Sequence, residues 1–265
     1  MRILYIGDVM GEVGIEVVEQ IVPRLRREKN LDFVVAQAEN VSLGKGITPI
    51  DFARLKRSGV DFFTGGNHSF AREAIYPALA DPHQPIIRPA NYPTTMPGRG
   101  YKYAQTPLGP VLVISMLGKV VGRDADKELA NPLQCMDEIL TAESDTPKVA
   151  TIVNFHGDYS SEKVVIGHYV DGRVTMAVGD HWHVPTADAR VLPGGTAHQT
   201  DVGMCGILNS SLGVRYDAIT VRWRDGTPTR NVLETEGPRQ FNALLVTSNT
   251  ETGLAEHAEA IQIIL

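Results

Sequence analysis

The sequence predicts an α/β protein in which two β layers pack together and helices flank them. In the first third of the 265-residue chain, short apolar runs alternate with segments of helical spacing, the pattern of a parallel sheet covered by helices. In the second half, strand-like segments and Gly-rich turns dominate and supply the second β layer. No repeat, low-complexity tract or linker interrupts the chain, so we expect one domain over 1–265.

The first third gives the clearest elements. Val17, Ile21 and Leu25 recur every four residues, which is the spacing of one face of a helix. Apolar runs such as RILYIG and DFVVAQ have the length of buried strands. The predicted strands are 2–7, 32–37 and 61–65, and the predicted helices are 12–29, 49–57 and 71–80.

The rest of the chain is less regular. A Pro- and Gly-rich segment at 81–100 predicts a long loop. The predicted strands are 101–105, 111–117, 149–155, 173–178, 197–202, 212–223 and 241–247, with helices at 132–143 and 161–168. A last helix is expected from Thr250 onward, because Leu254, Ala258, Ile261 and Leu265 share one helical face.

Composition excludes several classes of protein. A net charge of −6 disfavours a long nucleic-acid groove, which needs a clustered basic surface. Cys135 and Cys205 stand alone, so neither a zinc motif nor a disulfide framework is indicated, and a reducing compartment is the simpler interpretation. The first apolar run is too short for a signal peptide, and no stretch approaches the ~18 apolar residues of a membrane span. We therefore expect a cytoplasmic protein without a membrane partner, and a homo-oligomer remains open.

Polar side chains of metal-ligand type follow five of the predicted strands. They are Asp8, then Glu39 and Asn40, then Asn67 and His68, then His156, and finally His181 and His183. Ligands of open α/β sheets bind at the carboxyl ends of the strands, so we expect one shared polar site. Taken singly, Asp8 would be a helix N-cap and the others loop or buried polar residues. Their recurrence at five strand ends favours the site.

The donor set indicates metal ions. Carboxylates that are removed from water repel one another and need a positive partner. Mixed imidazole, carboxylate and amide donors suit Fe, Mn, Zn or Co better than Ca or Mg. Six or seven donors exceed the three of a catalytic zinc, whereas two metals ~3.5–4 Å apart would use them all. In an extended GDHWH segment, His181 and His183 would face the site together while Trp182 points into packing.

These segments resemble the calcineurin-like metallophosphoesterases, in which such ligands also follow successive strands. IGDVMG, AQAEN, GGNHSF, SSEK and HVPTADARVLPGGTAHQTDVGM are similar to a bacterial branch of that superfamily, the 2′,3′-cyclic-nucleotide phosphodiesterases. The resemblance covers nearly the whole chain, and residues 181–204 are its most specific part. It implies an α/β/β/α fold and hydrolysis of small phosphoesters, with 2′,3′-cyclic nucleotides as the expected substrates, by attack of a hydroxide that bridges two metals.

The resemblance also implies a role for each residue. Asp8 and His183 would bind the first metal, and Asn67, His156 and His181 the second, with Glu39 bridging the two. Asn40 would contact the substrate phosphate or the metal-bound water and is also a candidate metal ligand. His68 would be the general acid or a phosphate contact. Iron is the first expectation for the two divalent or trivalent ions, with manganese or zinc as alternatives.

The chain departs from the superfamily pattern at three positions. Met10 stands where most members have a histidine ligand, a position that this branch also lacks. Asp180 and Asn154 differ from the residues expected beside the ligands, which concerns the residues that orient the ligands more than the ligands themselves. The sequence assigns no role to Asp180, and Asp158, Glu162 and Asp201 are left as neighbours of ligand segments. His83, His168 and His257 are expected in a loop or on helix surfaces, and His198 in a structural role.

Two rival functions remain open. Gly7, Gly11 and Gly14 after a strand are similar to a dinucleotide-binding turn, but Val9 occupies the position of an essential glycine. A metal-free protein that binds NAD would favour that alternative. The second rival is a non-catalytic regulator that keeps the metal site, which a protein inert on every phosphodiester would favour.

Overall fold

The computed structural model describes residues 1–119, 121 and 129–265. Its strands form two sheets. The first contains β1 (Arg2–Ile6), β2 (Asp8–Val9), β3 (Phe33–Gln37), β4 (Phe62–Thr64), β11 (Met204–Ile207), β12 (Arg239–Ser248) and β13 (Ala255–Ile264). The second contains β5 (Tyr101–Thr106), β6 (Gly109–Leu117), β7 (Ala150–His156), β8 (Met176–Asp180), β9 (Arg190–Val191) and β10 (Ala197–Gln199).

Each sheet contains a run of parallel strands. In the first, β1, β3 and β4 run parallel, and the order is β2-β11-β12-β1-β3-β4, with β13 on β12. In the second, β6, β7, β8 and β10 run parallel, in the order β5-β6-β7-β8-β10-β9. Parallel strands end at the same edge of a sheet, so the residues that follow them are brought together.

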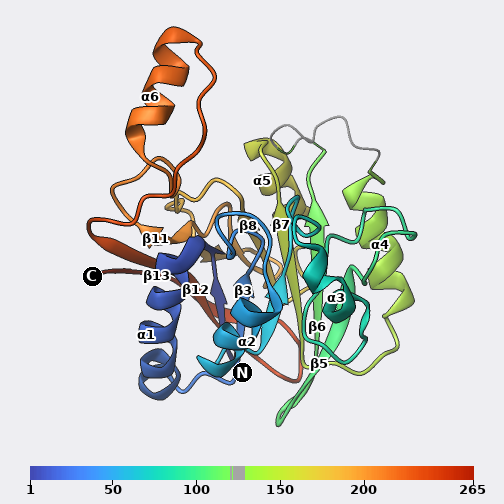
Figure 1. The fold of residues 1–265 in the computed structure, drawn as a ribbon. Coiled ribbons are helices and arrows are strands. Elements are labelled where there is room, and N and C mark those ends of the chain that lie inside the picture. The colour runs from blue at the N-terminus through green and yellow to red at the C-terminus, as the bar shows by residue number, and fades with distance from the viewer. Residues whose placement is uncertain (120, 122–128) are drawn as a thin grey trace.

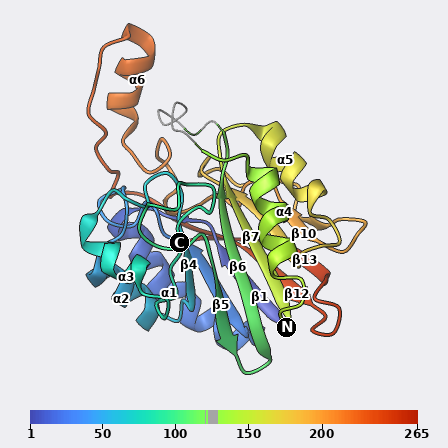
Figure 2. The ribbon, with the colours of Figure 1, turned by 90° about the vertical axis from the view of Figure 1, so that its right-hand side faces the viewer.

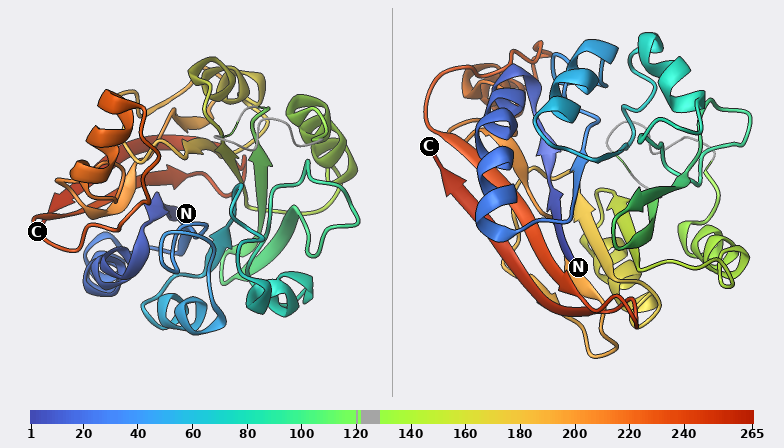
Figure 3. Two further views of the ribbon diagram at one scale, coloured as in Figure 1. Left: turned by 45° about the horizontal axis from the view of Figure 1, so that its top comes forward. Right: turned by 90° about the horizontal axis from the view of Figure 1, so that it is seen from below.

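Helices cover the outer face of each sheet. They are α1 (Gly11–Lys29), α2 (Pro49–Arg57), the 3-10 turn η1 (Glu73–Ile75), α3 (Tyr76–Ala80), α4 (Pro132–Ala142) and α5 (Ser160–Tyr169), whereas α6 (Tyr216–Asp225) does not cover a sheet. Figures 1 and 3 show α1, α2 and α3 along one side of the sheets and α4 and α5 along the other. Among the helices of the described ranges, none has the length and apolar character needed to cross a bilayer.

The strand pattern explains the layers. Ile3 and Tyr5 of β1 face the core between the two sheets, whereas Leu4 and Ile6 face the core beneath α1. Alternate residues of a strand point to opposite faces, and both faces here are apolar, as expected for a strand buried on both sides. The predicted fold class is confirmed. One face of each sheet packs on the other sheet, which also argues against the dinucleotide-binding alternative, whose single sheet carries helices on both faces.

The predicted strand at 212–223 is wrong. This segment forms a turn and then α6, which projects with its connections beyond the two sheets (Figure 2). Asp217 in the first turn, Arg222 and Arg224 in the last turn, and the left-handed cap Gly226 all favour a helix. α6 has no fully buried residue: Tyr216 and Trp223 are exposed, and Ile219 packs only partly against the cluster around Met10.

The predicted C-terminal helix is also wrong. The chain turns back at Gly253, whose φ of +71° suits glycine, and β13 then pairs with β12 along its length. Ile261 and Ile263 pack against the core beneath α1, and Ala258 against the core between the sheets. The hydrogen bonds offered by β12 override the helical spacing of the apolar residues, as tertiary context commonly does.

Candidate metal centre

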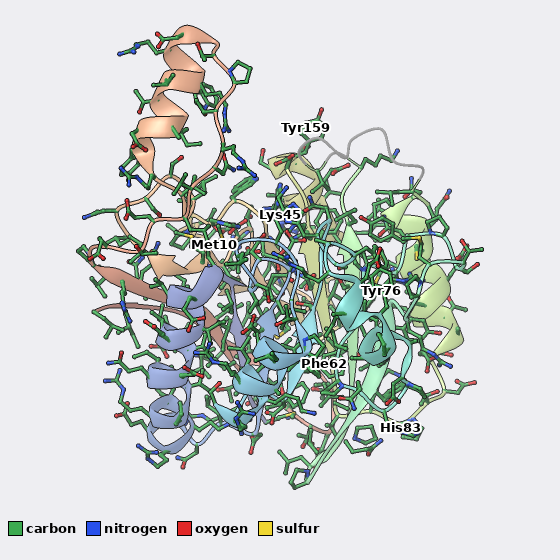
Figure 4. The ribbon with its side chains drawn as sticks, in the orientation of Figure 1. Met10, Lys45, Phe62, Tyr76, His83 and Tyr159 are labelled. Carbon is green, nitrogen blue, oxygen red and sulfur yellow. The ribbon has the colours of Figure 1, made fainter. Side chains whose placement is uncertain are left out.

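The predicted ligands meet at one edge of the two sheets. Asp8 begins β2, His156 ends β7, and His181 follows the last residue of β8. In Figure 4, Met10, Lys45 and Tyr159, which follow Asp8, Asn40 and His156 closely in sequence, lie toward the upper part of the molecule. His83 lies at the opposite end. The strand ends of both sheets therefore supply a single site.

The first group of donors contains Glu39, His156 and His181. One ligand atom of each lies within 4.8 Å of the other two. Nε2 of His156 is 3.1 Å from Oε1 of Glu39, and the rings of His156 and His181 contact edge to face. Oδ1 of Asn67 lies 3.0 Å from the same His156 Nε2. These four side chains have the donor atoms of one metal position.

The second group contains Asp8, Asn40 and His183. Nδ2 of Asn40 lies 3.3 Å from Oδ1 of Asp8 and 3.1 Å from Nε2 of His183. That His183 nitrogen is 3.8 Å from Asp8 Oδ1. The Asn40 amide also donates to Oε1 of Glu39 at 3.4 Å, so it joins the two groups.

Asp180, which the sequence could not place, orients His156. Its Oδ1 accepts a hydrogen bond from Nδ1 of His156, which leaves Nε2 directed at Glu39. Its Oδ2 accepts from Tyr5, Gln37 and Asn154. A carboxylate in this position fixes the ring and tautomer of a ligand histidine. The available sequence signal was alternation: Gln37 and Asn154 each lie two residues before a predicted ligand and so share its strand face.

The HWH segment, residues 181–183, is not extended, so the prediction of an extended segment is wrong. His181 has a φ of +97° and His183 a φ of +63°, values that side chains other than glycine rarely adopt. Oδ2 of Asp8 accepts the His181 N–H at 3.0 Å, and Oδ2 of Asp201 accepts the next N–H, that of Trp182, at 2.9 Å. Two buried carboxylates thus bend the backbone into a turn. Both imidazoles nevertheless lie beside the predicted ligands, and Trp182 packs away from them against Lys163.

Burial and neighbouring charges set the protonation of the histidines. Burial lowers the pKa of His181 to about 3 and that of His183 to about 4, so both rings are neutral near pH 7. Burial alone would also lower the pKa of His156, but Glu39 and Asp180 on either side raise it well above its usual value. Neutral imidazole is the form that binds metals, so His181 and His183 need lose no proton.

The pKa values of the two central carboxylates, Glu39 and Asp8, are shifted in opposite directions. Burial alone would raise the pKa of Glu39, yet His156 and His68 lower it well below its usual value. Burial and the nearby Asp180 raise the pKa of Asp8 well above its usual value. An opposite charge close to Asp8 would reverse that rise, as a bound cation does.

His68 lies at the entrance of the site. Its Nδ1 is 3.0 Å from Oδ1 of Asn40 and 3.3 Å from Oε1 of Glu39, and its backbone N–H donates to Glu39. About a quarter of its side chain is exposed, compared with none for Glu39. His68 can therefore reach a bound molecule while it remains tied to the ligand groups.

The other sequence candidates have separate roles. Asp158 Oδ1 lies 3.0 Å from Nε2 of His181, and Glu162 accepts the backbone N–H of Lys119. Buried His198 donates from Nδ1 to the carbonyl of Ala177, in agreement with the structural role expected for it. Leu212, which the sequence did not single out, fixes His183 through its carbonyl, 3.0 Å from Nδ1.

The donor set fits metal ions. Three imidazoles, two carboxylates and two amides converge from five strand ends, and Fe, Mn and Zn accept this mixture. Among the described residues, the buried Nδ1 of His181 has no hydrogen-bond partner, so this ring keeps one nitrogen for a ligand. Glu39 lies in the first group and is bridged to the second by Asn40, as a shared ligand would be.

Several known proteins are similar to this chain in sequence and in fold. The chain is 35% identical over 264 residues to the 2′,3′-cyclic-nucleotide 2′-phosphodiesterase of Bacillus subtilis, covering 99% of this chain and 97% of the relative. A crystal structure described as a novel phosphatase from Mycoplasma pneumoniae superposes with a TM-score of 0.91 at 27% identity, covering 100% of this chain and 93% of that one.

Two structures from Thermus thermophilus extend the comparison. A hypothetical protein superposes with a TM-score of 0.89 at 32% identity over 100% of this chain and 99% of that one. A 5′-nucleotidase precursor, at 11% identity, shares the fold with a TM-score of 0.60 over 100% of this chain and 54% of that one. The YmdB-like protein family matches residues 4–261. The resemblance inferred from the sequence is therefore confirmed, and the chain belongs to the YmdB-like family, a branch of the metallophosphoesterases.

Proposed function

We propose that this chain is a phosphodiesterase that holds two metal ions where the two sheets meet and hydrolyses small cyclic phosphodiesters. The observation that carries the proposal is the pair of donor groups around Glu39 and Asp8, which Asn40 joins. A two-metal site hydrolyses phosphoesters because its ions activate a water molecule and neutralise the phosphoryl oxygens. The enzyme class, a phosphoester hydrolase, agrees with the names of the relatives.

Each residue has a proposed place. Asp8 and His183 hold the first metal, and Asn67, His156 and His181 hold the second. Glu39 is shared, because it contacts His156 directly and Asn40 links it to Asp8 and His183. Iron is the first candidate for both positions, and manganese and zinc also accept these donors.

Asn40 and His68 act on the substrate. The Asn40 carbonyl accepts from Nδ1 of His68, which fixes the tautomer and leaves Nε2 available on a side chain that is about a quarter exposed. In this proposal Nε2 contacts the phosphoryl group and, when protonated, transfers its proton to the departing ribose oxygen. Asn40 positions His68 and, through its contacts with Asp8, Glu39 and His183, links the ligands of the two metal sites.

The substrate class follows from charge and from the Bacillus relative. The chain carries a net charge of −6, which disfavours a long polyanion, whereas a single phosphodiester is neutralised by the metals themselves. The relative's name specifies a 2′,3′-cyclic nucleotide. We therefore propose nucleoside 2′,3′-cyclic phosphates as the first substrates to examine.

Elemental analysis and a substrate screen test the proposal together. The reconstituted wild type is expected to hold about two metals per chain and to prefer 2′,3′-cyclic nucleotides over linear diesters and phosphomonoesters. Glu39→Gln removes one charge from the shared ligand and is expected to lower both metal content and turnover by at least about 10-fold. Fewer than one metal per wild-type chain would refute the two-metal site. A metal-loaded wild type inert on every ester would favour the regulator instead.

His68→Ala separates catalysis from metal binding. We expect this variant to keep two metals, because no ligand is removed, and to lose about 10²–10⁴-fold in kcat, the usual contribution of a general acid. His83→Ala is the matched control, since His83 lies in an exposed loop at the opposite end of the molecule. Loss of both metals from His68→Ala would contradict the assigned role.

Gly66→Ala tests how closely the shared ligand is packed. A Cβ at this position would stand 2.2 Å from Oε2 of Glu39 and 2.6 Å from the His156 ring, so both ligands would have to move. We expect metal affinity, measured by calorimetric titration, to fall at least about 10-fold. Gly206→Ala is the control, because its Cβ would make ordinary contacts of 3.4 Å or more. Equal metal affinity in the two variants would show that Gly66 does not constrain the ligands.

A further inference from the structure

The side chain of Lys163 is completely buried. It lies on α5 with an exposed fraction of 0%, and its Nζ is 2.6 Å from Oδ2 of Asp201. The same ammonium sits 3.9 Å from the centre of the Trp182 ring. A charged group is buried at high free-energy cost unless it is paired. One of the two partners here, Trp182, lies between the predicted metal ligands His181 and His183, and the other, Asp201, binds the Trp182 N–H.

Asp201 connects this charge to the HWH turn. Its Oδ2, besides contacting Lys163, accepts the backbone N–H of Trp182 at 2.9 Å. Its Oδ1 accepts the N–H of Gly203 at 2.8 Å, and the Gly203 carbonyl accepts the N–H of Asp8 at 2.9 Å. Asp8 in turn accepts the His181 N–H. These contacts form a closed ring of hydrogen bonds around the turn.

The turn needs such support. His181 and His183 both have positive φ, a backbone region that residues other than glycine occupy only at a cost in free energy. Trp182 stands between them and is fixed on three sides. Its N–H is bound by Asp201, its Nε1 donates to the carbonyl of Asp158, and its ring lies against the Lys163 ammonium. Cation–π contacts of this kind strengthen when water is excluded.

We propose that Lys163 is a positioning residue for the metal centre. Its ammonium holds the Asp201 carboxylate and the Trp182 ring in place, and through them keeps His181 and His183 directed at the metal positions. This inference rests on the proposed two-metal function. Lys163 touches neither metal nor substrate, so its effect is expected on metal affinity first and on turnover only as a consequence.

The test uses Lys163→Met, which keeps the length of the side chain and removes its charge. Calorimetric titration of the metal-free protein with Mn²⁺ is expected to show at least about 10-fold weaker binding, the range seen when groups that orient ligands are removed. Lys163→Arg keeps a cation over the ring and is expected to stay within about threefold of wild type. Lys102→Met is the matched control: Lys102 is also buried, but its Nζ binds the carbonyls of Leu79, Asp81 and Gln84.

Fluorescence gives a second measurement that general destabilisation would not change. The chain has two tryptophans, Trp182 and the exposed Trp223, so Trp223→Phe leaves Trp182 as the single emitter. In that background the emission is expected to change as Mn²⁺ binds. Adding Lys163→Met should shift the change to at least about 10-fold higher Mn²⁺, and adding Lys102→Met should leave it where it was.

Each result decides the inference. Mn²⁺ affinity of folded Lys163→Met within twofold of wild type would overturn it, and so would an equal loss in Lys163→Arg, because charge would then not matter. If Lys163→Met does not fold, the double variant Lys163→Met/Asp201→Asn, which buries no charge at this point, replaces it: weakened binding supports the inference, and wild-type binding overturns it. Failure of the proposed function appears elsewhere, as absence of Mn²⁺ binding in the wild type itself.

Discussion

The burial of four carboxylates at one edge of the sheets is the constraint on which the site depends. Asp8, Glu39, Asp180 and Asp201 are all almost completely removed from water. Removing an ionised carboxylate from water is costly unless donors or cations surround it, so each must be compensated where it lies. The compensation determines which residues occupy the neighbouring strands.

The four carboxylates are compensated in different ways. Asp180 accepts hydrogen bonds from the side chains of Tyr5, Gln37, Asn154 and His156. Asp201 accepts them from the Lys163 ammonium and from two backbone N–H groups. Glu39 lies against His156 and His68. Asp8 accepts hydrogen bonds from the Asn40 amide and the His181 N–H, but the imidazole of His183 is neutral and lies 3.8 Å away, and burial and Asp180 raise the pKa of Asp8. Its surroundings are therefore those that most favour a bound cation.

Much of this arrangement could be predicted from the sequence because it depends on local rules. Buried strands appear as apolar runs, and the residues that follow them share an edge when the strands are parallel. That rule brought Asp8, Glu39, His156 and the HWH pair together without any knowledge of the strand order. The order of the strands and their exact ends, such as Met176–Asp180 for the predicted 173–178, depend on pairing between distant segments.

The errors also have a common physical origin. β13 was mistaken for a helix because its apolar spacing is ambiguous, and β12, which overrides that spacing, is a separate segment of the sequence. α6 was mistaken for a strand because none of its apolar residues is fully buried, so they do not mark one buried helical face. Asp180 could not be placed because its four partners come from three separate strands, β1, β3 and β7, and only the folded chain brings them together.

The HWH turn shows how the remaining unpredicted feature arises. An alternating pattern in a strand would place both histidines on one face without strain, yet the chain adopts positive φ at both. Asp8 accepts the N–H of His181 and Asp201 accepts the next one, that of Trp182, and the backbone bends so that both buried carboxylates are satisfied. Leaving a buried carboxylate without donors costs more free energy than an unusual φ, which costs about 1–3 kcal/mol, so the turn is the less costly solution. The hydrogen bonds to these two buried carboxylates therefore set the backbone conformation here, and that conformation places both imidazoles in the site.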